Sequence, residues 1–218
     1  IVAWNALISG YVEQGRGHEA LKCYEKIERE GISPDIVMFT CLLKACGSTG
    51  AIDKGKKVHD EIVRKGFMKN EDIVLGTALV EMYGKCGLPG KAQDVFNMLP
   101  VRNIISWTAL MSGYVDQHYD REVLYWFYKM QEEGLIPDAA AFSCGLKACG
   151  IIRSISLGHS MYVGIVKSGL DQNSTVGNML VDMFGKCGLL EEAQQVFDKL
   201  LSRDNVSWSS LMMGYAQH

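Results

Sequence analysis

The sequence predicts an all-α protein, a right-handed α-solenoid superhelix of stacked helix-turn-helix repeats, because three phrases recur along it in a fixed order. The first phrase, as in WTALMSGYVDQ, begins at Trp4, Trp107 and Trp208. The second phrase, as in FTCLLKACG, begins at Phe39 and Phe142, and the third, as in GTALVEMYGKCG, begins at Gly76 and Gly177. Recurrence of this kind indicates supersecondary units that stack on their neighbours to bury a continuous core.

Aligned on these phrases, the chain forms a single repeat array over residues 1–218. It has six full units and the first helix of a seventh, which are Ile1–Asp35, Ile36–Asp72, Ile73–Asn103, Ile104–Asp138, Ala139–Asn173, Ser174–Asp204 and the partial unit 205–218. The full units are 35, 37, 31, 35, 35 and 31 residues long, so every third unit is short.

The first unit shows why each unit is expected to be a helical hairpin. Apolar residues recur at helical spacing over residues 4–11 and 20–27, and the polar stretch 14–17 interrupts them. Gly31 suits a helix C-cap, and Pro34 follows where a longer helix would be costly. A single hairpin cannot bury its apolar stripe, so the hairpins must stack. We expect their first helices to line one concave wall, the predicted binding surface.

Composition limits what this wall can bind. The formal net charge is −3 and the pI is about 6.0, which lacks the strongly basic signature of proteins that hold nucleic acid mainly by its phosphates. No apolar run approaches the roughly 20 residues that cross a bilayer, so no membrane partner is expected. The chain begins at Ile1 without a methionine and stops at His218 within a helical pattern. We therefore expect it to be an excerpt from a longer protein.

No residue pattern predicts chemistry. The seven cysteines contain no CxxC pair, which favours a reducing compartment over a disulfide framework. The tryptophans that begin the first phrase lie on its apolar stripe, so core packing is favoured over a base-stacking platform. No catalytic motif or phosphate-cradling glycine loop is present, and we expect no enzyme activity, cofactor or small-molecule substrate. Four cysteines at matching repeat positions are interpreted as packing residues and not as metal ligands: Cys46, Cys86, Cys149 and Cys187.

Several segments are similar to the characteristic sequence motifs of one repeat family: SWTALMSGYV from Ser106, LKACG from Leu43 and Leu146, EMYGKCG from Glu81 and DMFGKCG from Asp182. With them, the whole chain resembles the pentatricopeptide-repeat family, in particular the PLS subclass, in which ordinary, long and short repeats alternate in triplets. The resemblance implies an RNA-editing or RNA-processing factor of the mitochondrion or chloroplast. Its partners would be single-stranded organellar RNA and other proteins of an editing complex.

The same resemblance implies that a deaminase, where one is present, is a separate domain with an HxE motif and paired cysteines for zinc. The paired cysteines of that signature do not occur in this sequence. Any cytidine deaminase domain would therefore lie outside this chain.

Proteins of this family read about one base per repeat with the fifth and the last residue of the repeat. Uracil and guanine present a ring N–H donor on the Watson–Crick edge, whereas cytosine and adenine present an accepting nitrogen. A carboxylate only accepts, and an amide can donate, so Asp at the last position favours uracil or guanine and Asn favours cytosine or adenine. At the fifth position, Thr or Ser leaves room for a purine and Asn for a pyrimidine.

The resemblance assigns a base to each full repeat. The ordinary and short repeats give U for Asn5 with Asp35, A for Thr77 with Asn103, G for Thr108 with Asp138, and U for Asn178 with Asp204. The long repeats obey this code less regularly and give G for Thr40 with Asp72 and A for Ser143 with Asn173. If Asn70 is the last residue of the second unit in place of Asp72, its base becomes A. The predicted target is 5′-U-(G/A)-A-G-(A)-U-3′.

Two further sets of residues carry RNA-binding roles in the family. The second residue of a unit wedges between neighbouring bases, which assigns Val2, Val37, Val74 and Ile105. A solvent-facing helix start is the alternative for these positions, and for Ala140 and Thr175 both interpretations stay open. The thirteenth residue contacts a phosphate, which assigns Lys85 and Lys186 of the short repeats.

One other class of repeat protein fits the helical hairpins. Tetratricopeptide-like scaffolds also stack hairpins around a groove and bind a peptide or protein, but their period is a steady length of about 34 residues. The alternating unit lengths and the Asn or Asp that closes each unit favour the RNA reader.

Overall fold

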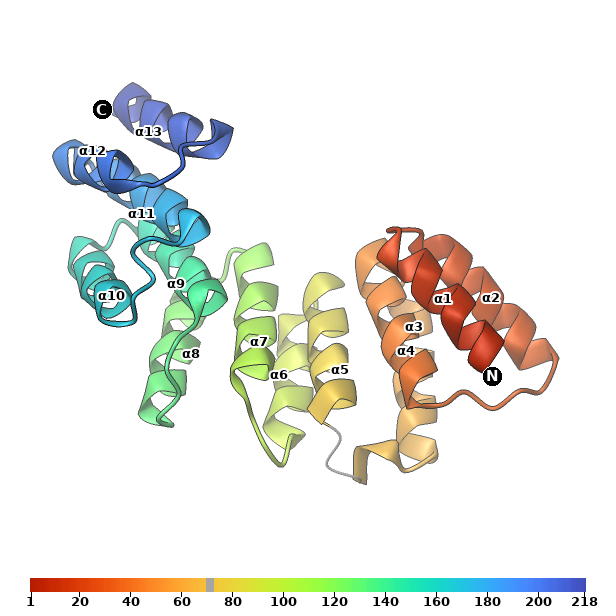
Figure 1. Cartoon of the computed structure of the whole chain (residues 1–218). Coiled ribbons are helices and arrows are strands. Elements are labelled where there is room, and N and C mark those ends of the chain that lie inside the picture. Colours follow the sequence, from red (N-terminus) through yellow and green to blue (C-terminus); the bar gives the residue numbers. More distant parts are fainter. Residues whose placement is uncertain (70–72) are drawn as a thin grey trace. The chain divides into compact units, whose positions relative to one another are not determined.

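The computed structural model describes residues 1–69 and 73–218, and within these residues the secondary structure is entirely helical. The chain divides into two compact units, Ile1–Gln117 and His118–His218. Figure 1 shows the helices of both units along the chain. The predicted all-α class is confirmed.

The first unit contains seven α-helices and one short 3-10 helix among its described residues. They are α1 (Val2–Glu13), α2 (Gly17–Arg29), α3 (Ile36–Thr49), α4 (Ile52–Arg64), η1 (Phe67–Lys69), α5 (Ile73–Lys85), α6 (Pro89–Met98) and α7 (Ile104–Asp116). Helices α1, α3, α5 and α7 pack side by side in that order, and α2, α4 and α6 each pack on the helix before them.

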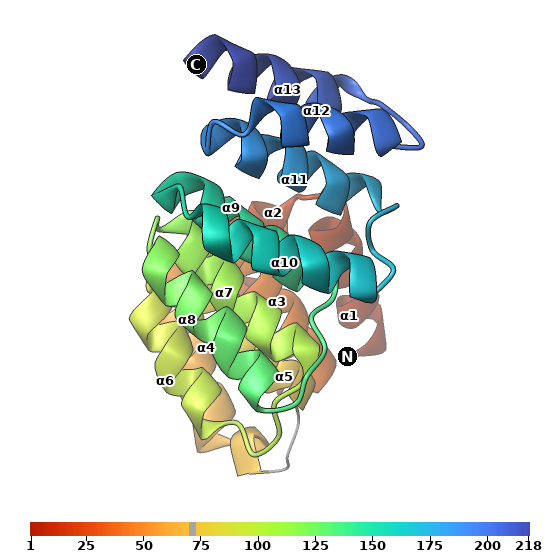
Figure 2. The same ribbon diagram turned by 90° about the vertical axis from the view of Figure 1, so that its left-hand side faces the viewer.

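The second unit continues the alternation. Its helices are α8 (Asp120–Glu132), α9 (Ala139–Ile152), α10 (Ile155–Lys167), α11 (Ser174–Lys186), α12 (Leu190–Lys199) and α13 (Asn205–Gln217). Helix α11 packs between α9 and α13, and Figure 2 shows α11, α12 and α13 in successive layers. In each unit the first helices of consecutive repeats thus form one row, as predicted. The repeat boundaries themselves stay a prediction.

Aromatic packing joins each short repeat to the helix that follows it. The Trp107 ring is fully buried and forms a T-shaped pair with the Phe96 ring, with 4.8 Å between the ring centroids. The Trp208 and Phe197 rings form the same kind of pair, with 4.7 Å between their centroids. The interpretation of these tryptophans as packing residues is confirmed for Trp107. Trp208 is 48% exposed, because only α11 and α12 cover α13 among the described residues.

The cysteines behave as small packing residues. Cys46 and Cys149 are fully buried, and burial raises the pKa of each thiol to about 12. Cys86 and Cys187 are half-buried at the ends of α5 and α11, and burial raises their pKa as well. A buried neutral thiol is a poor nucleophile and a poor metal ligand, since both roles need the thiolate. Among residues 1–69 and 73–218 no group of three potential metal ligands converges.

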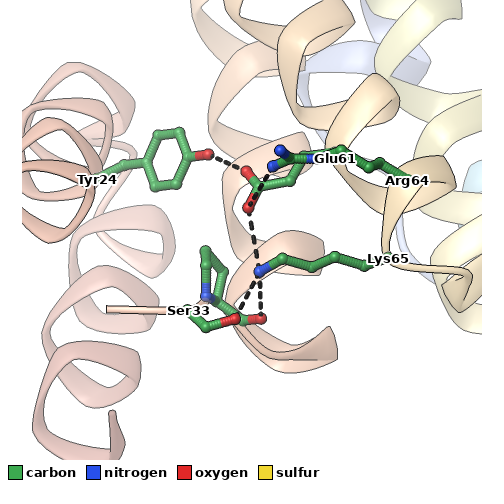
Figure 3. A network of polar contacts seen from close by, with 6 residues as sticks. Tyr24, Ser33, Glu61, Arg64 and Lys65 are labelled. Atoms are coloured by element: carbon green, nitrogen blue, oxygen red, sulfur yellow. Dashed lines mark hydrogen bonds and ion pairs between the residues drawn. The ribbon is translucent and has the colours of Figure 1, made fainter. Parts of the chain in front are cut away.

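A polar network holds the linker between α2 and α3 (Figure 3). The Tyr24 hydroxyl on α2 donates to the Glu61 carboxylate on α4 over 2.7 Å, and burial together with this bond raises the pKa of Tyr24. Lys65 forms a 3.1 Å ion pair with Glu61 and donates to Ser33 Oγ over 2.7 Å and to the Pro34 carbonyl over 3.4 Å. The segment that leads into α3 is therefore held by Lys65, at the C-terminal end of α4.

A pair of glycines allows two helices to approach closely in each unit. A Cβ on Gly113 of α7 would lie 2.7 Å from the Cα of Gly84 on α5, and a Cβ on Gly214 of α13 would lie 2.9 Å from the Cα of Gly185 on α11. In both contacts the neighbouring atom belongs to the backbone of the other helix, so a change of side-chain rotamer could not make room for the added Cβ. The first helices of a short repeat and of the next ordinary repeat can approach this closely only because both residues lack a side chain.

None of the helices in the described part of the chain is both long and apolar enough to cross a membrane.

The glycine contact leads to a stability prediction. Gly113→Ala should lower the free energy of unfolding by about 1–3 kcal/mol, as overpacking typically does, and the urea midpoint measures this. Gly10 occupies the equivalent position of the first repeat, in α1, and a Cβ there would have no neighbour within 4 Å. Gly10→Ala is therefore the matched control and should stabilise the protein by roughly 0.5–1 kcal/mol. Equal effects of the two substitutions would contradict the prediction.

Candidate nucleic-acid interface

The last residue of a repeat caps the first helix of the next repeat. In every case that the structure describes, one side-chain oxygen accepts the backbone N–H of the residue three positions later, as expected of an N-cap. The distances are 2.9 Å for Asp35, 3.0 Å for Asn103, 2.8 Å for Asp138, 3.1 Å for Asn173 and 2.8 Å for Asp204.

Because one side-chain oxygen forms the cap, only the other polar group of the side chain can hydrogen-bond to a ligand. At Asn103 and Asn173 the amide oxygen faces the backbone N–H, so the NH₂ group is the part that remains. At Asp35 and Asp138 one carboxylate oxygen caps the helix and the second oxygen remains an acceptor. The helix cap thus presents Asn as a donor and Asp as an acceptor, which is the distinction that the base assignments require.

In the first repeat the two residues of the assigned pair are hydrogen-bonded. Asn5 Nδ2 donates to Asp35 Oδ2 over 2.8 Å, while Asp35 Oδ1 caps α3 through Met38. The Asn5 Oδ1 atom is buried and has no hydrogen-bond partner among the residues that the structure describes. A buried acceptor without a partner carries a desolvation cost.

The sixth repeat forms the same pair with an additional partner. Asn178 is buried, and its Nδ2 donates to Asp204 Oδ1 over 3.3 Å. The Ser207 hydroxyl donates to Asn178 Oδ1 over 2.6 Å. Met38 stands where Ser207 does, three residues after the capping Asp35, which explains why the equivalent oxygen of Asn5 is left without a partner.

At three of the full repeats, and at Ser209 of the partial seventh unit, the hydroxyl side chain at the fifth position bonds to a carbonyl of its own helix. In the full repeats, the hydroxyl of Thr40 donates to the Ile36 carbonyl over 2.8 Å, that of Thr108 to the Ile104 carbonyl over 2.8 Å, and that of Ser143 to the Ala139 carbonyl over 2.7 Å. Because the hydroxyl proton is used within the helix, the oxygen lone pairs are what these side chains offer outward.

Helix α5 carries a cavity of about 200 Å³ that gathers five of the assigned residues, one of which is Thr40 of the preceding repeat. Thr77 and Asn103, the assigned reading pair of the third repeat, both line it. So do Val74 and Ile105, the assigned wedges of the third and fourth repeats. Ligand cavities for drug-sized molecules measure roughly 300–1,000 Å³, so this space suits one planar ring system. Its apolar lining and its few polar groups match the needs of a single nucleobase.

All six assigned pairs stay predictions as base readers. Thr108 lies in the first unit and Asp138 in the second. Asp72, and its alternative Asn70, fall outside the described residues, so the second repeat shows only Thr40. Ser143 and Asn173 both lie in the second unit, where each bonds to the helix that carries or follows it.

The assigned wedge residues are exposed at the starts of the first helices. Val2, Val37, Val74 and Ile105 are each more than half exposed, and Ala140 and Thr175 are exposed as well. Exposure fits both a wedge and a solvent-facing helix start. The shared cavity favours the wedge interpretation for Val74 and Ile105 alone.

The two assigned phosphate contacts are already ion-paired. Lys85 Nζ lies 2.6 Å from Glu81 Oε1, and Lys186 Nζ lies 2.6 Å from Asp182 Oδ2, each one helical turn away. The carboxylates offset the lysine charge, so these lysines offer a phosphate less attraction than free ammonium groups would.

Sequence reasoning missed two groups at this surface. Ser106 and Ser207 complete capping boxes with Asn103 and Asp204, and the N-x-x-S and D-x-x-S spacing was the signal for them. Lys44 and Glu81 also line the cavity on α5.

Known proteins place the chain in a family. The family models described as PPR repeat family and PPR repeat match residues 1–48, and residues 37–67, 77–104, 105–135 and 178–205, respectively. The chain belongs to the pentatricopeptide-repeat (PPR) family.

Curated PPR relatives cover the whole chain. It is 34% identical over 217 residues to the chloroplastic pentatricopeptide repeat-containing protein At4g18520 of Arabidopsis thaliana and 32% identical over 217 residues to the mitochondrial protein At3g09040 of the same plant. These matches span 100% of this chain but only 35% and 21% of the two relatives. The chain therefore corresponds to a minor part of each of these PPR proteins.

A solved PPR structure has the same fold. The crystal structure of PPR10 in complex with an 18-nucleotide psaJ RNA element matches 98% of this chain and 37% of its own, with a TM-score of 0.60 and 19% sequence identity. At this identity the likeness establishes the fold.

The Asp204 cluster leads to a titration prediction. The backbone N–H of Ser207 donates to the carboxylate, and the Ser207 hydroxyl shares its one proton between this carboxylate and Asn178 Oδ1. Both groups lower the pKa of Asp204, which NMR should place below the ordinary value of about 3.9. Because the folded-state pKa is lowered, the interaction stabilises the protein above the unfolded pKa, and this contribution is lost as pH falls through the folded pKa.

Two variants make this test specific. Ser207→Ala removes the hydroxyl donor and keeps the backbone N–H, so the pKa of Asp204 should rise part of the way to its ordinary value. Asp204→Asn identifies the resonance by its disappearance. A pKa that does not move in Ser207→Ala would show that the hydroxyl has no part in lowering it.

Proposed function

We propose that this PPR chain binds single-stranded organellar RNA through its row of first helices, reads about one base per repeat, and serves an RNA-editing or RNA-processing factor as its recognition module. The predicted target is 5′-U-(G/A)-A-G-(A)-U-3′. The names of the chloroplastic and mitochondrial relatives support a site of action in one of these organelles. The PPR10 complex with RNA supports the class of ligand.

The cavity on α5 is the observation that carries this proposal. Thr77, Asn103, Val74 and Ile105 all line it, so a base there would have polar partners for its edge and apolar side chains to contact. The cap leaves the Asn103 NH₂ group as a donor, which suits the ring nitrogen acceptor of adenine. The small Thr77 side chain leaves the length that a purine needs.

The chain acts on RNA by binding and positioning it. Among the described residues, the polar side chains at the reading positions hold helix caps and hydrogen bonds, and none of these is paired with a general base as a catalytic nucleophile would be. Any chemistry on the RNA would belong to another domain or partner protein of the factor.

Asn103→Asp tests the assignment of the third base. The substitution keeps an oxygen for the cap of α7 and replaces the remaining donor by an acceptor. Preference should therefore move from A to G at the third base, with a change in relative affinity of roughly tenfold or more, as expected when a buried donor or acceptor loses its partner. Fluorescence anisotropy with two RNAs that differ only at this base measures the preference.

Asn97→Asp on α6 is the matched control, because it adds the same charge at an exposed residue away from this cavity. It should leave the preference for A over G unchanged. The wild-type chain should also prefer the predicted RNA over a scrambled strand and over the DNA equivalent. Equal affinity for all three strands would sink the proposal of base-specific reading.

A further inference from the structure

A row of three charges crosses from each long repeat to the following short repeat. In the first unit it consists of Lys44 on α3 and of Glu81 and Lys85 on α5. The second unit repeats it with Lys147 on α9 and with Asp182 and Lys186 on α11. In both units the two helices pack side by side, so the row lies on adjacent first helices.

The two lysines of a row differ in their partners. Lys85 and Lys186 each hold a carboxylate at 2.6 Å on their own helix. Lys44 and Lys147 form no ion pair within the part of the chain that the structure describes, and Lys44 is exposed. Each row therefore contains one cation whose charge is offset and one whose charge is available.

Lys44 also lies at the candidate base site. Its side chain lines the same cavity as Thr77 and Asn103, on the side of the preceding repeat. A strand with its third base in this cavity would pass its backbone across Lys44 on the way from the second base. In a chain with a net charge of −3, such a local cation is where a phosphate gains most.

We infer that Lys44, and by repetition Lys147, are the principal phosphate-binding residues of this surface, in place of Lys85 and Lys186. The ligand is the phosphodiester between the base read by a long repeat and the base read by the following short repeat. In each row the acidic residue, Glu81 or Asp182, keeps the second lysine in an ion pair. This inference rests on the proposed RNA-binding function and adds to it the residues that contact the backbone.

The salt dependence of RNA affinity tests the inference. Each phosphate contact to a single strand adds about 0.7 to the slope of log affinity against log salt. Lys44→Gln should therefore make the slope shallower by about 0.7, and Lys147→Gln should do the same. Affinity should fall equally for the matched RNA and for an RNA with a changed third base, because a phosphate carries no sequence information.

Glu81→Gln provides a test of opposite sign. It releases Lys85 from its ion pair, so the slope should become steeper by about 0.7 and affinity at low salt should rise. Lys57→Gln is the matched control for Lys44→Gln, because Lys57 is also exposed but lies on the second helix α4. The control should retain the wild-type slope.

The outcomes separate this inference from the proposed function. A wild-type chain that shows no base preference overturns the reading of bases. A wild-type chain that prefers the predicted RNA, with an unchanged slope in Lys44→Gln, overturns the role of Lys44. A slope that falls as much in Lys57→Gln as in Lys44→Gln would show a diffuse charge effect and would also overturn it.

Discussion

The helix cap at the repeat boundary is the interaction on which the interface depends. A stacked array must restart a helix at each repeat, and the free N–H groups of that helix need an acceptor. Asp or Asn at the last position supplies it, as Asp35 and Asn103 show. The same bond fixes the side chain in one orientation, so that its second polar atom is held in place before any ligand arrives. Under the proposed function, fold stability and ligand recognition therefore share one residue per repeat.

The triplet of unequal repeats produces unequal surroundings for this shared element. Paired glycines bring the short repeat and the next ordinary repeat into backbone contact, as at Gly84 and Gly113. The cavity lined by one assigned reading pair and two assigned wedge residues belongs to the short repeat, on α5. Long repeats contribute a hydroxyl at the fifth position and a lysine one turn later, as in Thr40 and Lys44. A triplet is thus a better unit of description than a single repeat.

Much of this could be predicted from the sequence, because helical periodicity and repeat phrasing depend on local residue spacing. The helix hairpins and the buried Trp107 followed from it. Details that depend on a neighbouring repeat could not be predicted in the same way. The Asn5 and Asn178 pairs look alike, yet their hydrogen bonding differs because Met38 replaces a serine. The ion pair of Lys85 was visible as helical spacing, but only its short distance shows that pairing competes with a phosphate role.

That one residue caps a helix and, under the proposed function, reads a base has a consequence for how such proteins evolve. Asp and Asn are nearly equal as helix caps, so one can replace the other at a repeat boundary with little effect on folding. Under the proposed reading, the same exchange would alter the preferred base. A population of these chains could therefore drift between RNA targets by single-residue steps that purifying selection for stability would not remove. Retargeting would then be limited by the loss of the old transcript and not by the loss of the fold.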